Sequence, residues 1–350
     1  MNTTKCRASV ISQSERSLNL SWTIDDSFPH KEHEWITNPP NMELKLFFIP
    51  AATCFIVAAF ATAAVLLTIL STFSLRKETR FILMGNALLS DLLYLFLNTT
   101  AGICNVSSVK VSKEACALIL FFLSVTYGGG VLTTALMVVD TYLAILWPLR
   151  YSSILPPSRT KKLIVFLWIT SSFSSAVMFL VLHFTRNPDT CHPDSCSLPL
   201  IFVMTLHAES AIRLFHILCI TAFLLCFSLI ICCYVFLCYK TRQSGVWKSV
   251  SSRANITFMM HHFILFSYYL PLLLLLAESV LYINNTIGYR TSLLATFTIC
   301  DVLIVLPKCI CPYLYGFRYR EIYRSLQLFH AFKLHILVKP KNRLVLSRDT

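Results

Sequence analysis

Long apolar stretches separated by short polar segments dominate the pattern of this chain. Seven stretches carry no charge or almost none, at residues 46–75, 81–109, 115–139, 163–182, 214–239, 254–277 and 291–306. A helix rises ~1.5 Å per residue, so about 20 apolar residues cross the ~30 Å hydrocarbon core of a bilayer. Backbone groups in lipid must be hydrogen-bonded within their own segment, which favours helices. The pattern predicts an all-α membrane protein, a bundle of seven transmembrane helices.

The composition agrees with a membrane protein and excludes an ordinary soluble one. Hydrophobic residues make up 56% of the 350 residues and charged residues 13%, whereas soluble domains carry about 25% charged residues. The net charge is +13, and it is spread over the loops. We interpret it as membrane topology with attraction to anionic inner-leaflet lipid, and we expect no nucleic-acid partner.

The distribution of basic residues predicts the orientation. Of the 30 Lys and Arg residues, 19 fall in segments 76–80, 150–162, 240–253 and 318–348, all on one side of the predicted bundle. This side should be cytoplasmic. We therefore predict an extracellular tail at 1–45, a membrane domain at 46–316, and a cytoplasmic amphipathic helix with a basic tail at 317–350. Residues 1–45 show no cleavable signal peptide, so we expect the first span to direct insertion.

Sequons and cysteines add two expectations for the outer side. Glycosylation is expected at the outer sequons of Asn2, Asn19, Asn105 and Asn284. Most of the 14 cysteines lie in spans, where they act as small hydrophobes. The segment from Cys191 to Cys196 could hold a metal, but we favour a disulfide from one of these two cysteines to the top of the third span, because outer disulfides persist.

Several motifs occur in a fixed order along the spans. They are Leu89-Ser90-Asp91-Leu92, Cys116, Asp140-Thr141-Tyr142 with Pro148-Leu149-Arg150-Tyr151, Trp168, Tyr269-Leu270-Pro271, and Cys311-Pro312-Tyr313-Leu314-Tyr315. Together they resemble the motifs of rhodopsin-like G-protein-coupled receptors, with the D-R-Y box at 140–142 and the N-P-x-x-Y element at 311–315. Features at 244–254 and 306–315 also resemble an orphan member of that family. Because that relative is an orphan, the resemblance does not identify a ligand.

The resemblance implies a plasma-membrane receptor that passes an unknown extracellular ligand's signal to a heterotrimeric G protein or arrestin. It implies that Cys116 bonds Cys196 or Cys191. It places Asp140, Thr141, Tyr142, Tyr234 and Tyr315 at the face for the G protein. It places Asp91, Lys308, Tyr269, Pro271, Cys311 and Pro312 in a core switch. No cofactor, metal or catalytic site is expected.

Several switch positions depart from the family pattern. Thr141 replaces the arginine of the D-R-Y box, and Ser251 stands where the family often has the glutamate that pairs with it. The first span has no asparagine at 55–70. These departures leave an alternative function open: a receptor-like protein that does not activate G proteins conventionally, such as a scavenger, a chaperone or an arrestin-biased receptor. A transporter, a channel and an odorant receptor fit the sequence less well.

Ionisable residues inside a membrane are costly and usually functional. Asp91 lies where the resemblance implies a bound sodium ion, but Gly130 and Cys311 occupy two positions of polar helpers. Lys308 lies four residues before Pro312, one helical turn away. We expect Lys308 to pair with Asp91 and to replace the sodium ion, since an uncompensated buried charge costs several kcal/mol. The alternative is that Lys308 extends toward the membrane surface or is partly neutral.

Acidic residues near the outer ends of the sixth and seventh spans suggest a ligand pocket. Asp301 and Glu278 could bind a cationic group, with Leu123, Tyr127 and Tyr268 lining the same cavity. Internal pairing of Asp301 with Arg213 or His216 is an equal alternative.

Overall fold

The computed structural model describes residues 41–107, 109, 111–147, 149–184, 196, 252–284 and 286–318, together with scattered residues between 214 and 239. Nearly all of these residues are helical. The long helices are α3 (Asn41–Ser71), α4 (Thr79–Val106), α5 (Lys113–Leu146), α7 (Pro157–Phe184) and α11 (Ser252–Ile283). The last span consists of α12 (Tyr289–Thr298), the π-helical turn η2 (Ile299–Leu303) and α13 (Val305–Arg318).

Five of the described helical segments are long and apolar enough to cross a membrane. They are Phe48–Ser71, Thr79–Val106, Glu114–Thr141, Phe263–Ile283 and Thr291–Gly316. Helix α7, at the fourth predicted span, has 28 residues but is not among them. The described residues between 214 and 239, at the fifth predicted span, are helical.

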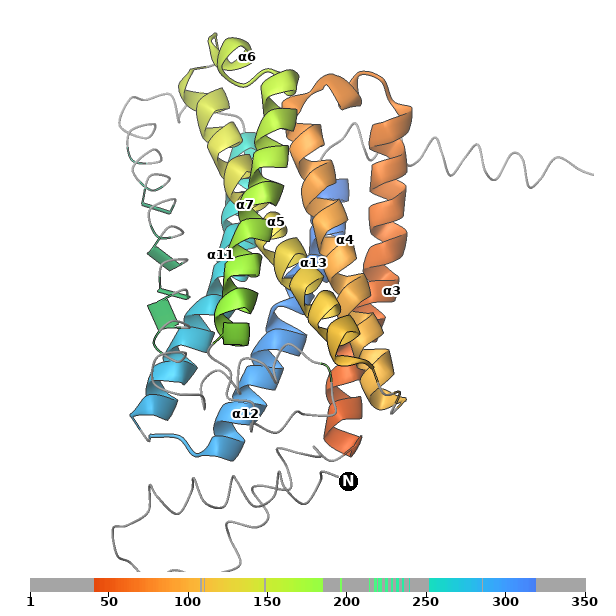
Figure 1. Ribbon diagram of the computed structural model, residues 1–350. Coiled ribbons are helices and arrows are strands. Elements are labelled where there is room, and N and C mark those ends of the chain that lie inside the picture. The colour runs from red at the N-terminus through yellow and green to blue at the C-terminus, as the bar shows by residue number, and fades with distance from the viewer. Residues whose placement is uncertain are drawn as a thin grey trace, which may run out of the picture.

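The helices stand side by side along their length (Figure 1). The short helices η1 (Leu75–Lys77) and α6 (Tyr151–Ile154) lie at one end, and the connection between α11 and α12 lies at the other. Helices consecutive along the chain pack together from α3 to α5, and α5 also packs on α7. Helix α13 returns to pack against α3 and α4, so residues from both ends of the chain meet in the interior.

The helices extend beyond the apolar runs that predicted them. Helix α5 reaches Leu146, past the predicted end at residue 139, and α13 continues to Arg318, past residue 306. Helix α3 begins at Asn41, within the segment predicted as tail. An apolar run marks the part of a helix that matches the bilayer core, whereas backbone hydrogen bonding continues until a cap or a proline stops it. Ser112 caps α5, its Oγ accepting from the Ala115 N–H, and α5 ends just before Pro148.

Three consecutive glycines let α5 approach two neighbouring helices. A Cβ atom on Gly128 would collide with Ser171 Oγ of α7, and one on Gly129 would lie 3.6 Å from both Trp168 of α7 and Ser90 of α4. Small residues are typical of close helix packing in membranes. Hydrogen bonds reinforce the contact, because Ser171 Oγ donates to the Val125 carbonyl oxygen at 2.9 Å.

The interior contains two apolar clusters. One, toward the end that carries α6, includes Leu88, Val131, Met137 and Tyr315. The other, toward the opposite end, includes Leu95, Leu123, Leu275 and Ile304. Large apolar side chains also cover the outside, and Phe60 and Phe173 are 77% and 70% exposed. This pattern is typical of helices that face lipid, where the surface does not need to be polar.

Candidate functional site

A buried ion pair joins α4 to α13 between the two apolar clusters. Lys308 Nζ lies 2.7 Å from Asp91 Oδ1, and the two residues are only 1% and 3% exposed. Tyr268 of α11 donates its hydroxyl hydrogen to the other carboxylate oxygen, Asp91 Oδ2. One carboxylate therefore holds together three helices that are far apart in the sequence.

Three tyrosine rings surround the ammonium group. Lys308 Nζ lies 4.7 Å from the ring centroid of Tyr94, 4.8 Å from that of Tyr268 and 5.3 Å from that of Tyr127. The face of an aromatic ring attracts a cation, most strongly where water is excluded. The rings therefore add a cation–π attraction to the ion pair that the ammonium group makes with Asp91.

A glycine brings α5 to the same point. A Cβ atom on Gly130 would lie 3.2 Å from Asp91 Oδ1 and 3.7 Å from Lys308 Nζ, so a larger residue would compete with the ion pair for space. Ser90, next to Asp91, donates to the Thr126 carbonyl oxygen of α5 at 2.7 Å. Helices α4, α5, α11 and α13 thus meet at a centre formed by Asp91, Lys308, Tyr268, Tyr94 and Tyr127, which we call the lysine–aspartate centre.

The sequence predicted part of this centre. It predicted that Lys308 pairs with Asp91, and the structure brings the two together; an extended Lys308 at the membrane surface is excluded by its burial. Tyr268 was expected to line a ligand pocket, but its hydroxyl binds Asp91. Sequence reasoning missed Tyr94, although it follows Asp91 by three residues and so shares its helix face.

Two more carboxyl groups lie toward the other end of the interior. Glu278 of α11 is 5% exposed, and its Oε1 accepts a hydrogen bond from Ser292 Oγ of α12. Within the described part of the chain, Glu278 Oε2 has no hydrogen-bond partner. Asp301 lies in the η2 turn. Arg213 and His216, the alternative partners expected for Asp301, lie outside the described residues.

Two tyrosine hydroxyls of the lysine–aspartate centre are also unsatisfied. The hydroxyl oxygens of Tyr94 and Tyr127 are buried and have no partner among the described residues, and their rings lie 5.9 Å apart. Leu123, predicted for the ligand pocket, is buried in the apolar cluster on this side. Buried polar atoms are normally hydrogen-bonded, so these hydroxyls, Glu278 Oε2 and Thr99 Oγ1 are exceptions within the described part of the chain.

The predicted switch residues of α11 and α13 follow Tyr268 and Lys308 within four residues along these helices. Helix α11 continues through Pro271, and α13 contains Pro312 next to the buried Cys311. The Tyr269 hydroxyl lies 3.2 Å from Ser228 Oγ of the fifth predicted span.

At the end that carries α6, Asp140 has a tyrosine partner. The Tyr151 hydroxyl donates to Asp140 Oδ1 at 2.7 Å, and burial together with this carboxylate raises the pKa of the Tyr151 phenol. Thr141 Oγ1 donates to the Met137 carbonyl oxygen of its own helix at 2.9 Å. The Tyr315 hydroxyl of α13 lies 3.7 Å from Met137 Sδ. Thr141 therefore bonds within α5, and Tyr151 satisfies the carboxylate of the box.

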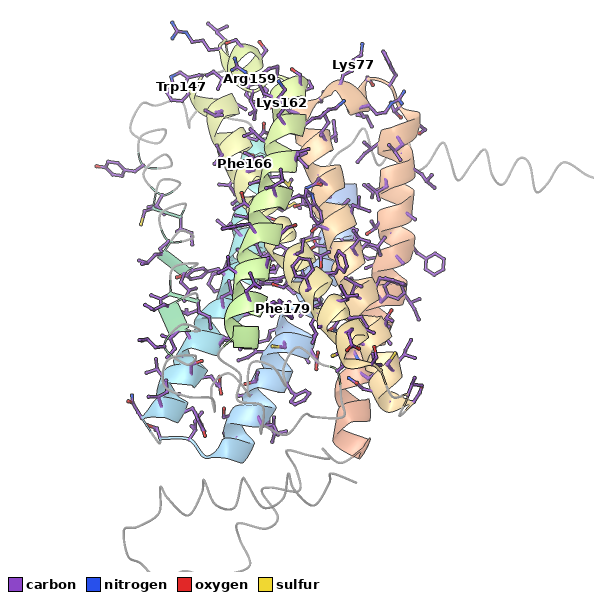
Figure 2. All side chains as sticks on the ribbon, in the orientation of Figure 1. Lys77, Trp147, Arg159, Lys162, Phe166 and Phe179 are labelled. Atoms are coloured by element: carbon purple, nitrogen blue, oxygen red, sulfur yellow. A yellow bond between two sulfur atoms is a disulfide. The ribbon has the colours of Figure 1, made fainter. Side chains whose placement is uncertain are left out.

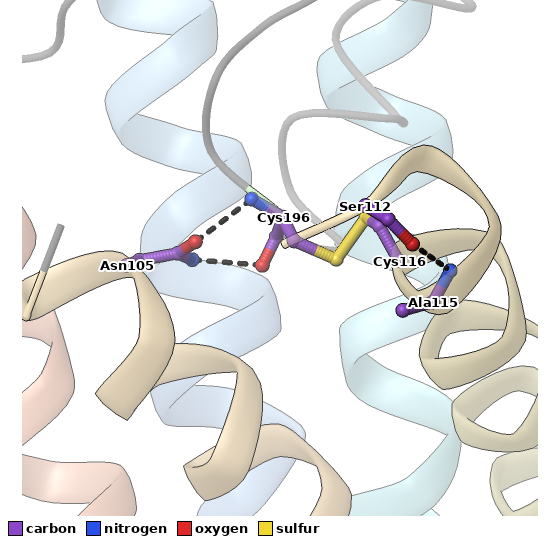
Figure 3. Close-up of a disulfide and its surroundings, with 5 residues drawn as sticks. All are labelled: Asn105, Ser112, Ala115, Cys116 and Cys196. Atoms are coloured by element: carbon purple, nitrogen blue, oxygen red, sulfur yellow. Dashed lines mark hydrogen bonds between the residues drawn. A yellow bond between two sulfur atoms is a disulfide. The ribbon is translucent and has the colours of Figure 1, made fainter. Parts of the chain in front are cut away.

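A disulfide fixes the opposite end of α5 (Figure 3). It joins Cys116 to Cys196, with the Cα atoms 5.7 Å apart. This confirms the predicted disulfide and selects Cys196 over Cys191 as its partner. The side-chain amide of Asn105 makes two hydrogen bonds to the backbone of Cys196.

Several predicted residues lie outside the described part of the chain. They are Asn2, Asn19, Cys191, Tyr234 and the amphipathic helix after residue 318. Tyr142 lies in α5, but its side chain is not described. Asn284 is exposed just after α11.

Comparison with known proteins identifies the family of this molecule. The family model described as "7 transmembrane receptor (rhodopsin family)" matches residues 62–315, which contain the lysine–aspartate centre and the disulfide. The chain belongs to the rhodopsin family of seven-transmembrane receptors. The apolar helices and the family together indicate a multi-pass protein of the plasma membrane. This family is one of receptors and not an enzyme class.

Similar proteins within the family include receptors of two kinds. The chain is 26% identical to the human probable G-protein coupled receptor 148 over 297 residues, covering 81% of this chain and 82% of the relative. It is 24% identical to the human olfactory receptor 51F2 over 321 residues, covering 86% of each. Human olfactory receptor 4N5 is 27% identical over 225 residues, covering 59% of this chain and 71% of the relative.

Proposed function

We propose that this protein transmits the binding of an extracellular ligand to a heterotrimeric G protein or to arrestin at the cytoplasmic face. It would do so as a complete seven-helix bundle with an amphipathic eighth helix on the inner leaflet. The end that carries α6 would face the cytoplasm. Lys77, Arg159 and Lys162 gather at this end (Figure 2), which supports the orientation because cytoplasmic loops are enriched in Lys and Arg.

The observation that carries the proposal is the lysine–aspartate centre. A receptor needs an internal element with two discrete arrangements that a ligand can bias. Asp91 bonds both Lys308 of α13 and Tyr268 of α11, so a movement of either helix must exchange a strong polar contact. Pro271 would permit such a movement of α11, since proline removes one helix hydrogen bond.

Lys308 would do the work of the sodium ion that the resemblance implies near Asp91. Its ammonium group supplies the positive charge from a covalent tether, and Gly130 and Cys311 leave the surroundings poor in the polar ligands that a metal ion needs. The cation at this position would then be held covalently, and receptor activation would not depend on the release of sodium.

The ligand would bind nearer the outer ends of α5, α11 and α12 and of the fifth span. Glu278 Oε2, Tyr94 Oη and Tyr127 Oη lack partners within the described residues. A ligand with an ammonium or guanidinium group would satisfy these oxygens, because both groups are hydrogen-bond donors only.

At the inner face, Thr141, Tyr142, Tyr234 and Tyr315 would shape the surface for the G protein. Thr141 bears on the alternative of a receptor-like protein that does not couple conventionally, because it removes the cation of the box. Asp140 is nevertheless bonded by Tyr151, so the inner end of α5 keeps an ordered polar contact without an arginine.

Signalling without ligand, measured by G-protein dissociation, tests the proposal. Cells expressing the wild type, Thr141→Arg or Thr141→Gln would be compared at equal surface density, with untransfected cells as the baseline. Thr141→Gln is the matched control, because it lengthens the side chain without a charge. We expect basal output from the wild type and a several-fold higher output from Thr141→Arg only. Silence of all three variants with every G-protein class would contradict coupling and support the scavenger or chaperone alternative.

A further inference from the structure

Asn105 lies in the last turn of α4 and holds the backbone of Cys196 with both atoms of its amide. Asn105 Nδ2 donates to the Cys196 carbonyl oxygen at 2.7 Å, and the Cys196 N–H donates to Asn105 Oδ1 at 2.8 Å (Figure 3). Cys196 is 4% exposed and forms the disulfide with Cys116. The contact bridges 91 residues of sequence, so it connects α4 directly to the second outer loop.

The two hydrogen bonds use one edge of the planar amide. Because Oδ1 and Nδ2 bond the same residue, the hydrogen donated by Nδ2 is the one on the same side of the C–N bond as Oδ1. A glycan replaces one Nδ2 hydrogen and makes the amide secondary. Secondary amides are almost always trans, so the sugar carbon takes the side of Oδ1. It would occupy the place of the Cys196 carbonyl oxygen.

We propose that Asn105 stays unglycosylated in the folded receptor and acts as a positioning residue for Cys196, although Asn105-Val106-Ser107 is a sequon. A glycan on Asn105 and the two-bond contact with Cys196 exclude each other. Asn284, by contrast, is exposed beyond the end of α11, where a glycan meets no such competition. The proposal rests on the proposed orientation in placing this end of the bundle outside the cell.

Mass spectrometry of the full-length receptor from the surface of mammalian cells tests the modification. Enzymatic removal of N-glycans in H₂¹⁸O converts each glycosylated asparagine to an ¹⁸O-labelled aspartate. We expect label at Asn284 and none at Asn105 in molecules whose Cys116–Cys196 bond is intact. Label at Asn105 in those molecules would overturn the proposal. This readout is independent of signalling, so a silent receptor would leave it unaffected.

Two substitutions separate the amide from the sequon. Ser107→Ala removes the sequon and keeps the Asn105 amide, and Ser107 is exposed. Asn105→Asp also removes the sequon, but it replaces the Nδ2 donor with an oxygen that faces the Cys196 carbonyl oxygen. The readout is maleimide labelling of Cys116 and Cys196 in whole-cell extracts, which does not require transport to the surface.

We expect Ser107→Ala to match the wild type and Asn105→Asp to show several-fold more labelling of the two cysteines. Equal labelling of Ser107→Ala and Asn105→Asp would refute the positioning role. Increased labelling of Ser107→Ala would show that the glycan, and not the amide, supports this loop, and it would overturn the proposal as well.

Discussion

Lys308 is the residue whose surroundings say most about this receptor. Burial removes its ammonium group from water, and the effective cost for one buried ion is several kcal/mol. Asp91 offsets the charge at 2.7 Å, and three tyrosine rings lie within 5.3 Å of Nζ. Each partner is therefore tolerated only while the other is present.

Removal of Asp91 alone should destabilise the protein, and removal of both charges should restore it. We expect Asp91→Asn to cost about 3–5 kcal/mol, the usual cost of leaving one buried charge unpaired. Asp91→Asn with Lys308→Met should recover most of this loss, because both charges are gone. The measurement is the thermal unfolding midpoint of the detergent-solubilised receptor. Lys77→Met, at an exposed lysine, is the control for removal of a cation.

Sodium provides a second readout of the same pair. Replacing NaCl with N-methylglucamine chloride should leave the unfolding midpoint of the wild type unchanged, because Lys308 already supplies the cation. A double variant as unstable as Asp91→Asn, or a wild type that sodium stabilises, would disprove the function assigned to the pair.

How far the sequence predicts a single residue depends on whether its role is local. Lys308 could be matched to Asp91 because three things limited the choice of partner: the sign of the charge, the free-energy cost of burying it unpaired, and the helical spacing from Pro312. Tyr94, Tyr127 and Tyr268 could not be assigned in the same way, because an aromatic residue in a span is as suited to packing as to binding a cation. Their roles follow from the meeting of α4, α5 and α11, which no segment specifies alone.

Helix packing depends on the glycines of α5. Gly128 faces Ser171 of α7, and Ser124 of α5 lies within 2.8 Å of Ser175 of α7, oxygen to oxygen. Polar contacts of this kind require backbones that approach closely, and side chains larger than hydrogen at Gly128 would keep the two helices apart.

We expect Gly128→Ala to lower the unfolding midpoint, with a cost of about 1–3 kcal/mol, as is usual for overpacking. The matched control is Gly85→Ala, whose added Cβ would lie 3.7 Å from Leu66, an ordinary contact. Because the collision is with Ser171 Oγ, Ser171→Ala should recover part of the loss in the double variant. An unchanged midpoint for Gly128→Ala would mean that α5 and α7 separate without cost.

The sequence predicted where the helices lie better than where they end. The length of each apolar run located each described span. However, α5 and the last span continue through charged residues at which an apolar run ends, such as Asp140 and Lys308. The η2 turn was not predicted, because a π-helical turn leaves no clear pattern in the sequence. Such turns often occur at functional sites, and this one carries Asp301.

At the scale of the whole molecule, two carboxyl groups of the interior lie toward one end of the bundle, whereas exposed basic residues gather at the other end. Glu278 and Asp301 lie toward the disulfide end, Lys308 lies between the apolar clusters, and basic residues gather at the end that carries α6 (Figure 2). A cationic ligand would fit the end with the carboxyl groups, because it would bring a positive charge to carboxylates that have no cationic partner among the described residues. The fold alone does not define the ligand. The unpaired oxygen of Glu278 favours a ligand with a positive charge.

Neutralising Glu278 tests the expected cationic ligand, because the substitution should stabilise the protein alone and abolish its stabilisation by cations. Glu278→Gln keeps an oxygen to accept from Ser292 and removes a buried charge without a cationic partner in the described chain. We therefore expect it to raise the unfolding midpoint, which corresponds to a gain of about 1–3 kcal/mol in the free energy of unfolding. Benzylammonium and benzylguanidinium chloride should raise the midpoint of the wild type and not that of Glu278→Gln, while benzyl alcohol should raise neither. Glu114→Gln, at an exposed acid at the start of α5, should behave as the wild type. Equal stabilisation of wild type and Glu278→Gln by the cations would place their binding elsewhere.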